Sequence, residues 1–530
     1  MDGRAIRNPI LPGFNPDPAI CRAGDDYYIA ASTFEWFPGV QIHHSRDLVH
    51  WRLLTRPLTR ASQLDMIGNP DSCGVWAPCL TYSDGLFWLV YTDVKTRSAR
   101  FMSLHNCLVT APDIEGPWSE PIHLNASGFD PSLFHDDDGR KWVVNMLNDF
   151  RAGKNRFAGI LLQEYSHEER RLIGPIANIF PGTSLGSTEA PHLYKRDGWY
   201  YLMTAEGGTG YDHAVTMARS KDIAGPYEVD PANPILTSRG TDARLQKAGH
   251  ASLVEAPDGG CYIAHLCSRP VWVCDRRRSI LGRETALQEC RWTDDGWLRL
   301  ESGGTTPQDE VAAPDLPPCP FDAPPEREDF GSTDLPMAFQ SLRAPVDETW
   351  ASLTERPGRL RLYGREGTTS RHRQSLLARR IESLDCEAST CVSFRPESFQ
   401  QMAGLTAFYN VLTHYYLFVT HDEAAGRCVK LVAMDQGAYS EPAGAGVPLG
   451  NADPVLLKLS LRERVLQFAW SLDGSAWQTI GPKLDATILS DEYCSGFTGA
   501  MVGVACQDLT GRRLHADCDW FDYRDHMSET

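Results

Sequence analysis

The chain has 530 residues, more than one ordinary domain core holds, so two or three domains are expected. Hydrophobic residues make up 42% of it, which is typical of a globular protein. The net charge of −18 argues against nucleic acid and anionic membrane surfaces as partners and fits a neutral substrate.

The amino terminus predicts a cytoplasmic protein. Residues 1–9 contain no apolar core of a signal peptide, and no uninterrupted apolar stretch approaches membrane-spanning length. The 15 cysteines are scattered and form no Cys-x-x-Cys pair. We therefore expect reduced, mostly buried thiols.

One sequence pattern recurs five times in the first half of the chain. Each copy opens with a chemically distinctive residue, continues with small and apolar residues, places an Asp eight positions on, and ends in an aromatic-rich run. The opening residues, 54 to 61 positions apart, are Asp17, Trp76, Asp130, Glu189 and His250. A repeat of this length with hairpin signals inside it indicates blades arranged around an axis.

Each repeat predicts a β-hairpin. In the fourth, residues 190–195 form one strand, Asp197-Gly198 the turn, and residues 199–204 the return strand. Asp-Gly between apolar runs is a strong hairpin signal, because Gly accepts a positive φ and Asp tolerates it. No long segment with a 3.6-residue period interrupts the pattern, which disfavours a β/α barrel. The repeats therefore predict a five-bladed β-propeller over residues 1–305.

The second half of the chain predicts another all-β domain. Residues 306–325 contain seven prolines and are expected to form an extended connector. From residue 326 to 530 the repeat is absent, but strand signals continue, for example at 415–420, 429–434 and 456–461. Strands with turn punctuation over this length are typical of a β-sandwich.

The opening residues of the repeats include three acids, which suggests a catalytic site. In a propeller the first strand of each blade lines the channel, so Asp17, Asp130 and Glu189 would meet at one mouth. Clustering three carboxyls is costly, because like charges repel and raise one another's pKa. Glycoside hydrolysis needs such a cluster, with one protonated carboxyl as acid and one ionised carboxylate. A third carboxylate can keep the acid protonated. Phe34 and Trp76 would offer apolar faces to a sugar.

Structural roles for these residues compete with the catalytic one. A lone Asp-Pro is usually a turn, and Glu189 alone could be a solvated charge. Recurrence at equivalent positions favours a site. For His250 the two interpretations, a buried core histidine and a site residue, have equal weight. No cluster has the ligand spacing of a transition metal. The acids eight positions on are interpreted as hairpin residues, and they are Asp25, Asp84, Asp138, Asp197 and Asp258.

Several runs of residues carry a resemblance to a known family. The most distinctive are Phe14-Asn-Pro-Asp17-Pro-Ala-Ile, Ser32-Thr-Phe-Glu-Trp-Phe-Pro-Gly-Val, Gly74-Val-Trp-Ala-Pro and Ser187-Thr-Glu189-Ala-Pro-His. By these motifs the chain resembles glycoside hydrolase family 43, above all its two-domain bacterial β-xylosidases, a group that also includes α-L-arabinofuranosidases. Likeness at 281–285, 496–501 and 515–521 extends the resemblance over both domains and implies that the sandwich is concanavalin-like.

The resemblance implies an activity and catalytic roles. The implied enzyme is an inverting exo-β-1,4-xylosidase that releases D-xylose from the non-reducing ends of xylo-oligosaccharides, with α-L-arabinofuranosides as further substrates. Asp17 resembles the general base that activates water, and Glu189 the general acid. Asp130 resembles the residue that tunes and orients the acid. Arg283 is expected to donate hydrogen bonds to a sugar hydroxyl near the base.

The resemblance also implies the surroundings of the site. Phe34, Trp76 and Phe129 would wall the pocket, and Phe497 would reach from the sandwich to close it. Catalysis would need no cofactor, although some family members carry a calcium ion in the channel, which would place His250 near it through water. The sandwich is expected to build the interface of a homodimer or homotetramer.

Three alternatives stay open at this point. A retaining, fructan-hydrolysing five-bladed enzyme would use Asp17 as a nucleophile, with its carboxyls about 5–5.5 Å apart instead of about 6.5–9.5 Å. A relative specific for arabinan or arabinofuranosides would differ only in substrate. A non-catalytic propeller, a lectin or a scaffold, would bind without cleaving, but a scaffold has no reason to place acids at the axis.

Overall fold

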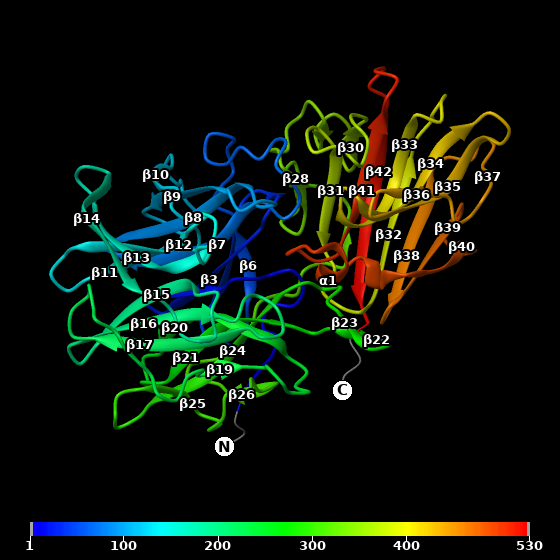
Figure 1. Ribbon diagram of the computed structural model, residues 1–530. Coiled ribbons are helices and arrows are strands. Elements are labelled where there is room, and N and C mark those ends of the chain that lie inside the picture. Colours follow the sequence, from blue (N-terminus) through cyan, green and yellow to red (C-terminus); the bar gives the residue numbers. More distant parts are fainter. Residues whose placement is uncertain (1–3, 527–530) are drawn as a thin grey trace.

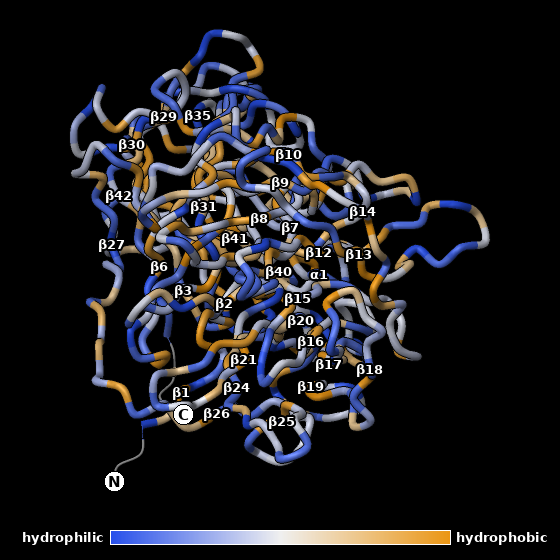
Figure 2. Tube along the Cα trace, turned by 90° about the vertical axis from the view of Figure 1, so that its left-hand side faces the viewer, coloured by the Kyte–Doolittle hydropathy of each residue, from blue (hydrophilic) through white to orange (hydrophobic). Residues whose placement is uncertain are grey.

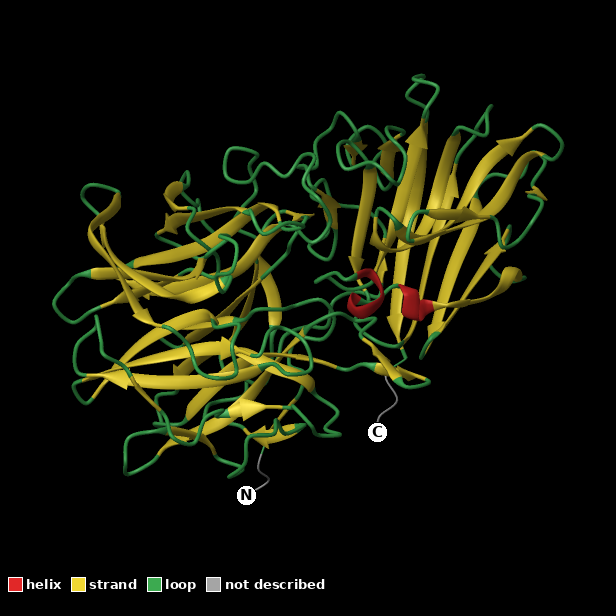
Figure 3. Ribbon diagram, in the orientation of Figure 1, coloured by secondary structure: helices red, strands yellow, loops and turns green. Residues whose placement is uncertain are grey.

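The computed structural model describes residues 4–526, and they fold into two β-domains that lie side by side (Figure 1). Strands dominate both domains, and the helical segments of the described chain are η1 (Ala486–Ile488) and α1 (Asp491–Cys494) (Figure 3). The prediction of an all-β chain, a five-bladed propeller followed by a sandwich, is confirmed. Within the described range, no helix combines the length and apolar character needed to cross a membrane.

Each blade is one antiparallel sheet whose strands follow chain order from the axis outwards. Blade 1 holds β2 (Ala19–Ala23), β3 (Asp26–Ala31), β5 (Gln41–Ser45) and β6 (Arg52–Thr55). Blade 2 holds β7 (Gly74–Ser83), β8 (Leu86–Thr96), β9 (Ser103–Ala111) and β10 (Ile122–Asn125). Blade 3 holds β11 (Ser132–His135), β12 (Lys141–Asn148), β13 (Phe157–Ser166) and β14 (Arg171–Phe180).

The last two blades complete the ring. Blade 4 holds β15 (Glu189–Arg196), β16 (Trp199–Glu206), β17 (Ala214–Ser220), β18 (Glu228–Val229) and β19 (Leu236–Thr237). Blade 5 holds β20 (Gln246–Glu255), β21 (Cys261–Ser268), β24 (Glu284–Trp292) and β25 (Leu298–Leu300). The first strands of neighbouring blades contact one another, which places them around the axis. A separate hairpin, β22 (Val271–Val273) and β23 (Arg276–Arg278), projects from blade 5.

The repeated acids of the hairpins lie in turns between the first two strands of each blade, as predicted. Asp84 and Asp197 have φ values of 56° and 50°, and each is followed by a glycine with positive φ. The left-handed turn that Asp-Gly favours therefore forms here. Residues 306–325, expected as a connector, include one short strand, β26 (Glu310–Ala312), which pairs with β1 (Ala5–Arg7).

The sandwich consists of two antiparallel sheets. One is built from β27 (Arg327–Glu328), β29 (Ala351–Ser352), β30 (Leu360–Tyr363), β42 (His515–Asp525), β32 (Asp385–Ser393), β38 (Val455–Arg462), β39 (Val465–Ser471) and β40 (Gln478–Asp485). The other is built from β36 (Ala438–Ser440), β37 (Val447–Pro448), β35 (Gly426–Asp435), β34 (Thr413–Asp422), β33 (Gln401–Asn410), β41 (Met501–Asp508), β31 (Ser375–Arg380), β28 (Gln340–Leu342) and β4 (Trp36–Phe37).

Strand periodicity explains the sandwich core. Along β38, Val455, Leu457, Leu459 and Leu461 are buried, while the residues between them are partly exposed. Alternate side chains of a strand point to opposite faces, so one face meets the other sheet. Hydrophobic segments accordingly concentrate in the strands, and the outer loops are mostly hydrophilic (Figure 2).

The strand β4 (Trp36–Phe37) joins the two domains. It belongs to the first propeller repeat by sequence, yet it pairs with β28 at the edge of a sandwich sheet, with Trp36 opposite Leu342. Trp36 is fully buried. The strand therefore fixes the sandwich beside the mouth of the propeller, in an arrangement that the sequence did not indicate.

Candidate active site

The five opening residues lie at or just before the starts of the inner strands. Asp17 and Asp130 precede β2 and β11, and Trp76, Glu189 and His250 lie at register shifts of β7, β15 and β20. Asp17, Asp130 and His250 have left-handed backbone conformations, with φ of 57°, 54° and 48°. Ala77 and Ala190, which follow the other two openers, have φ of 32° and 49°. Such strain in non-glycine residues persists only where the surroundings impose it, and it is common at functional sites. Irregular pairing at the strand starts turns the side chains into the channel mouth.

One cavity of about 300 Å³ collects the predicted site residues. All nine line it, and they are Asp17, Phe34, Trp76, Phe129, Asp130, Glu189, His250, Arg283 and Phe497. Radial repetition therefore does bring distant residues together. The cavity is also lined by residues that sequence reasoning missed, and they are Arg97, Met102, Arg156, Phe157, Gly208 and Thr209.

Asp17 is held as a carboxylate by three neighbours. The Ser32 hydroxyl donates to its Oδ2 at 2.6 Å, and a terminal nitrogen of Arg283 donates to its Oδ1 at 3.1 Å. The Nδ1 of His250 lies 3.8 Å from the same Oδ1. Burial alone would raise the pKa of Asp17, but these neighbours outweigh it and hold that pKa below its ordinary value. Asp17 is therefore ionised at neutral pH.

Glu189 and Asp130 have the opposite character. Burial, followed by the negative charge of Asp17, raises the pKa of Glu189 to about 8. Burial, followed by the charges of Glu189 and Asp17, raises the pKa of Asp130 well above its ordinary value. The sequence-based expectation is that Asp130 tunes the pKa of Glu189. In the structure that pKa is raised mainly by burial and by the charge of Asp17. Carboxyls with opposed protonation states suit acid–base chemistry.

Asp130 contacts the backbone beside Glu189. Its Oδ2 accepts a hydrogen bond of 3.1 Å from the peptide N–H of Ala190, the residue after Glu189. Ala190 has positive φ, so this hydrogen bond supports a strained peptide that sets the direction of the Glu189 side chain. The orienting role of Asp130 stays a prediction, and this contact agrees with it.

Aromatic rings wall the cavity. The ring centroids of Trp76 lie 5.9 Å from Phe34, 5.5 Å from Phe129 and 5.7 Å from Phe497. The last of these comes from the sandwich domain, so the pocket is complete only when both domains are present. Flat apolar faces of this kind pack against the C–H surfaces of sugars.

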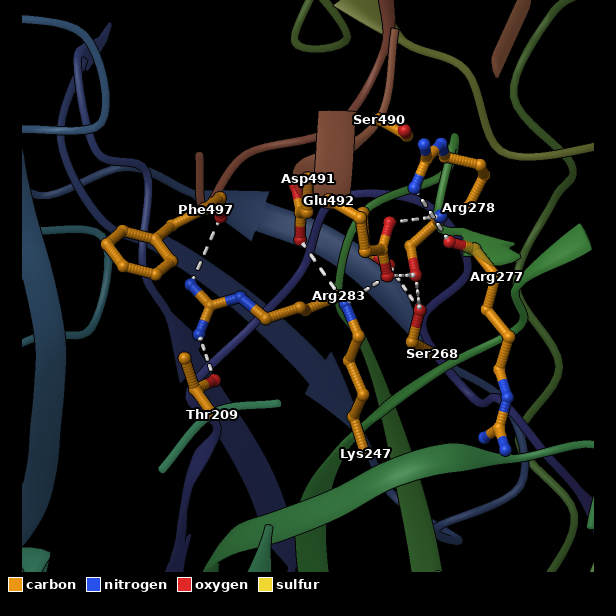
Figure 4. A network of polar contacts seen from close by, with 12 residues as sticks. Thr209, Lys247, Ser268, Arg277, Arg278, Arg283, Ser490, Asp491, Glu492 and Phe497 are labelled. Atoms are coloured by element: carbon orange, nitrogen blue, oxygen red, sulfur yellow. Dashed lines mark hydrogen bonds and ion pairs between the residues drawn. The ribbon is translucent and has the colours of Figure 1, made fainter. Parts of the chain in front are cut away.

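Arg283 connects Asp17 to the sandwich. One terminal nitrogen donates to Asp17 at 3.1 Å and to the Thr209 hydroxyl at 2.9 Å, and the other donates to the backbone oxygen of Phe497 at 3.1 Å. Figure 4 shows the contacts of Arg283 with Thr209 and Phe497. The contact from Arg283 to a sugar hydroxyl, which the resemblance implies, stays a prediction. In the structure the hydrogen bonds of Arg283 go to the protein, and the one to Asp17 stabilises the carboxylate.

The surroundings of His250 do not form a calcium cage. Across residues 4–526, no three His, Cys, Asp or Glu side chains are grouped to hold a metal ion. Asp17, the carboxylate beside His250, is already engaged by Arg283 and Ser32. A calcium ion held near His250 through water would not need such a group of side chains, so it stays a prediction.

The residues that sequence reasoning missed do not open a repeat, and no family motif assigns them a role. Thr209 lies in the loop between β16 and β17, and Arg97 in the loop between β8 and β9, outside the repeated pattern. Ser32 falls inside the distinctive run that begins at residue 32, but nothing in the run indicates that its hydroxyl faces Asp17. Only the packing of loops onto the mouth brings these groups to the site.

Comparisons with known proteins agree with this geometry. Residues 6–298 match the glycosyl hydrolases family 43, and residues 327–524 match the beta xylosidase C-terminal concanavalin A-like domain. The chain is 52% identical to xylosidase/arabinosidase 43B of Humicola insolens (98% of this chain, 97% of the relative). It is 50% identical to a beta-xylosidase of Bacillus subtilis strain 168 (98% and 99%). The crystal structure of a xylan beta-1,4-xylosidase from Bacillus halodurans C-125 superposes with a TM-score of 0.97 at 55% identity (98% and 100%).

Proposed function

The chain belongs to glycosyl hydrolase family 43, and from this premise we propose that it is an inverting exo-β-1,4-xylosidase. Its substrates are xylo-oligosaccharides, from whose non-reducing ends it releases D-xylose. The high identity to a beta-xylosidase over nearly the full length of both chains supports the substrate class. The structural match to a xylan beta-1,4-xylosidase supports the linkage.

One observation carries the proposal. A single cavity holds Asp17, kept ionised by Arg283, together with Glu189, whose pKa is raised to about 8. A base that is charged and an acid that is protonated at the same neutral pH are the two groups that hydrolysis with inversion requires. A lectin has no need for this opposed pair.

The roles of the residues follow from their protonation states. Asp17 accepts a proton from a water molecule as that water attacks the anomeric carbon. Glu189 donates its proton to the glycosidic oxygen as the bond to the leaving sugar breaks. Asp130 holds the peptide beside Glu189, and Arg283 and Ser32 hold Asp17. Proton and leaving group balance, because the released sugar takes the proton from Glu189 and the xylose takes the hydroxyl from water.

A second activity on α-L-arabinofuranosides has support of its own. A relative with 52% identity is named xylosidase/arabinosidase, so one close sequence is associated with both sugars. The aromatic walls contact a sugar mainly through its apolar faces, which discriminates weakly between two pentoses. We propose that arabinofuranosides are the lesser substrates.

Incubation with xylobiose and with the 4-nitrophenyl β-D-xylopyranoside and α-L-arabinofuranoside tests the proposal. We expect release of xylose, faster hydrolysis of the xyloside than of the arabinofuranoside, and α-xylose as the first anomer in proton NMR. First formation of β-xylose would identify a retaining enzyme. Binding of xylobiose without release of xylose would identify a lectin.

A further inference from the structure

A glutamate of the sandwich domain lies at the domain boundary behind the active site. Glu492, in helix α1, accepts hydrogen bonds from the Ser279 N–H (2.7 Å), the Ser279 hydroxyl (2.8 Å) and the Tyr211 hydroxyl (2.7 Å). The Nζ of Lys247 lies 2.8 Å from its Oε1. Four donors therefore converge on one carboxylate, three on Oε1 and one on Oε2. All of them come from the propeller. Figure 4 shows Glu492 and Lys247 at this boundary.

Each of these donors lies close in sequence to a residue of the catalytic cavity. Ser279 is four residues before Arg283, and Tyr211 is two residues after Thr209. Lys247 is three residues before His250, in the irregular start of β20. One side chain of the sandwich therefore ties together three propeller segments that carry polar groups of the site.

Backbone contacts also join the two domains beside Arg283. The N–H of Ala500 donates to the carbonyl oxygen of Ile280 at 2.9 Å. Gly282 has a φ of 73°, and a Cβ there would lie 2.0 Å from the Thr498 oxygen, so only glycine permits this approach of the two chains. The loop that presents Arg283 is therefore pressed against the sandwich segment that carries Phe497.

The positive charge of Lys247 requires a carboxylate at position 492. The side chain of Lys247 is 5% exposed, and its other acidic neighbour, Asp491, is 4.0 Å away. A buried ammonium requires a charged partner close by, and removing that partner strains the segment that holds it. Loss of the charge on Glu492 would therefore disturb Lys247 and, with it, the strand start at His250.

We propose that Glu492 is a positioning residue for the hydrolysis, through which the sandwich domain fixes the polar groups around Asp17. The inference rests on the proposed glycosidase function. Its consequence is that the sandwich contributes to turnover from a distance, in addition to contributing the ring of Phe497 to the pocket.

The test is the Glu492→Gln variant, assayed with 4-nitrophenyl β-D-xylopyranoside. The amide keeps the shape but has no charge for Lys247. We expect kcat to fall about 10- to 100-fold, because small misplacements far from the chemistry have effects of this size. KM should change much less. The acid limb of the kcat/KM profile should move to higher pH, because Arg283 depresses the pKa of Asp17 and would contact it less well. The other polar groups that act on Asp17, namely Ser32, His250 and His213, remain in the variant.

A matched control separates positioning from stability. Asp230 pairs with Arg299 at 2.5 Å inside the propeller, its side chain is fully buried, and neither residue lines the cavity. Asp230→Asn should lower the melting temperature yet keep the kcat and acid limb of the wild type. If Glu492→Gln behaves like this control, with only its melting temperature lowered, the proposal is wrong.

A second variant decides the matter if Glu492→Gln does not fold. Tyr211→Phe removes one hydroxyl from Glu492 without changing charge, and we expect a smaller decrease in kcat with an acid limb displaced in the same direction. An unchanged kcat and acid limb in this variant would then overturn the inference. Wild-type protein that releases no xylose would instead overturn the proposed function, so the two failures are distinguishable.

Discussion

Replacing the proposed acid by its amide, Glu189→Gln, tests the electrostatics of the site most directly. Burial and the charge of Asp17 raise the pKa of Glu189 from its ordinary 4.5 to about 8. At pH 7 a carboxyl with that pKa is about nine-tenths protonated, whereas the ordinary value would leave about 0.3% protonated. The environment thus increases the fraction of competent acid about 300-fold. Glutamine has the same shape but no proton to transfer.

The expected loss depends on the leaving group. For xylobiose, whose leaving oxygen must be protonated, kcat/KM should fall about 10²- to 10⁴-fold, the usual contribution of a general acid. For 2,4-dinitrophenyl β-D-xylopyranoside the loss should be less than about tenfold, because its leaving group, dinitrophenolate, departs as a stable anion without being protonated.

The pH profile provides an independent readout. In the wild type, activity on xylobiose should decline as the pH rises through about 8, because Glu189 loses its proton there. This basic limb should be absent from the variant with the dinitrophenyl substrate. Equal losses on both substrates, or a basic limb that persists in the variant, would refute the assignment of Glu189 as the acid.

Three further changes test the other groups. Asp17→Asn should lower kcat about 10²- to 10⁴-fold for every leaving group, because water activation is always needed, and a near-normal rate would reassign the base. Ser32→Ala removes a 2.6 Å hydrogen bond that favours the charged form of Asp17, so the acid limb of kcat/KM should move up by about one to two pH units. An unmoved limb would contradict the contact. Phe497→Ala keeps the backbone oxygen that binds Arg283 but removes the ring. KM for xylobiose should rise about tenfold, because the contact between ring and sugar contributes about 1.5 kcal/mol of binding free energy. A fall in kcat alone would show that the ring does not bind substrate.

The sequence determined which acids meet in the cavity, because a propeller converts repetition along the chain into convergence in space. Asp17, Asp130 and Glu189 occupy the same position in the first, third and fourth repeats, and each repeat begins with an inner strand. Hairpin turns such as Asp84-Gly85 could be predicted locally, since their conformation depends on the two residues themselves. The propeller and sandwich could thus be predicted from patterns alone.

Tertiary structure alone decided how the two domains share the site. β4 leaves the first repeat to pair with a sandwich strand, and Glu492 reaches back to the segments behind Arg283. Neither contact has a local signature, because each joins residues more than 200 positions apart. The protonation states likewise depend on burial and on neighbours from other blades. Sequence repetition specifies which side chains meet at an axis, while the charge each carries there depends on everything packed around it.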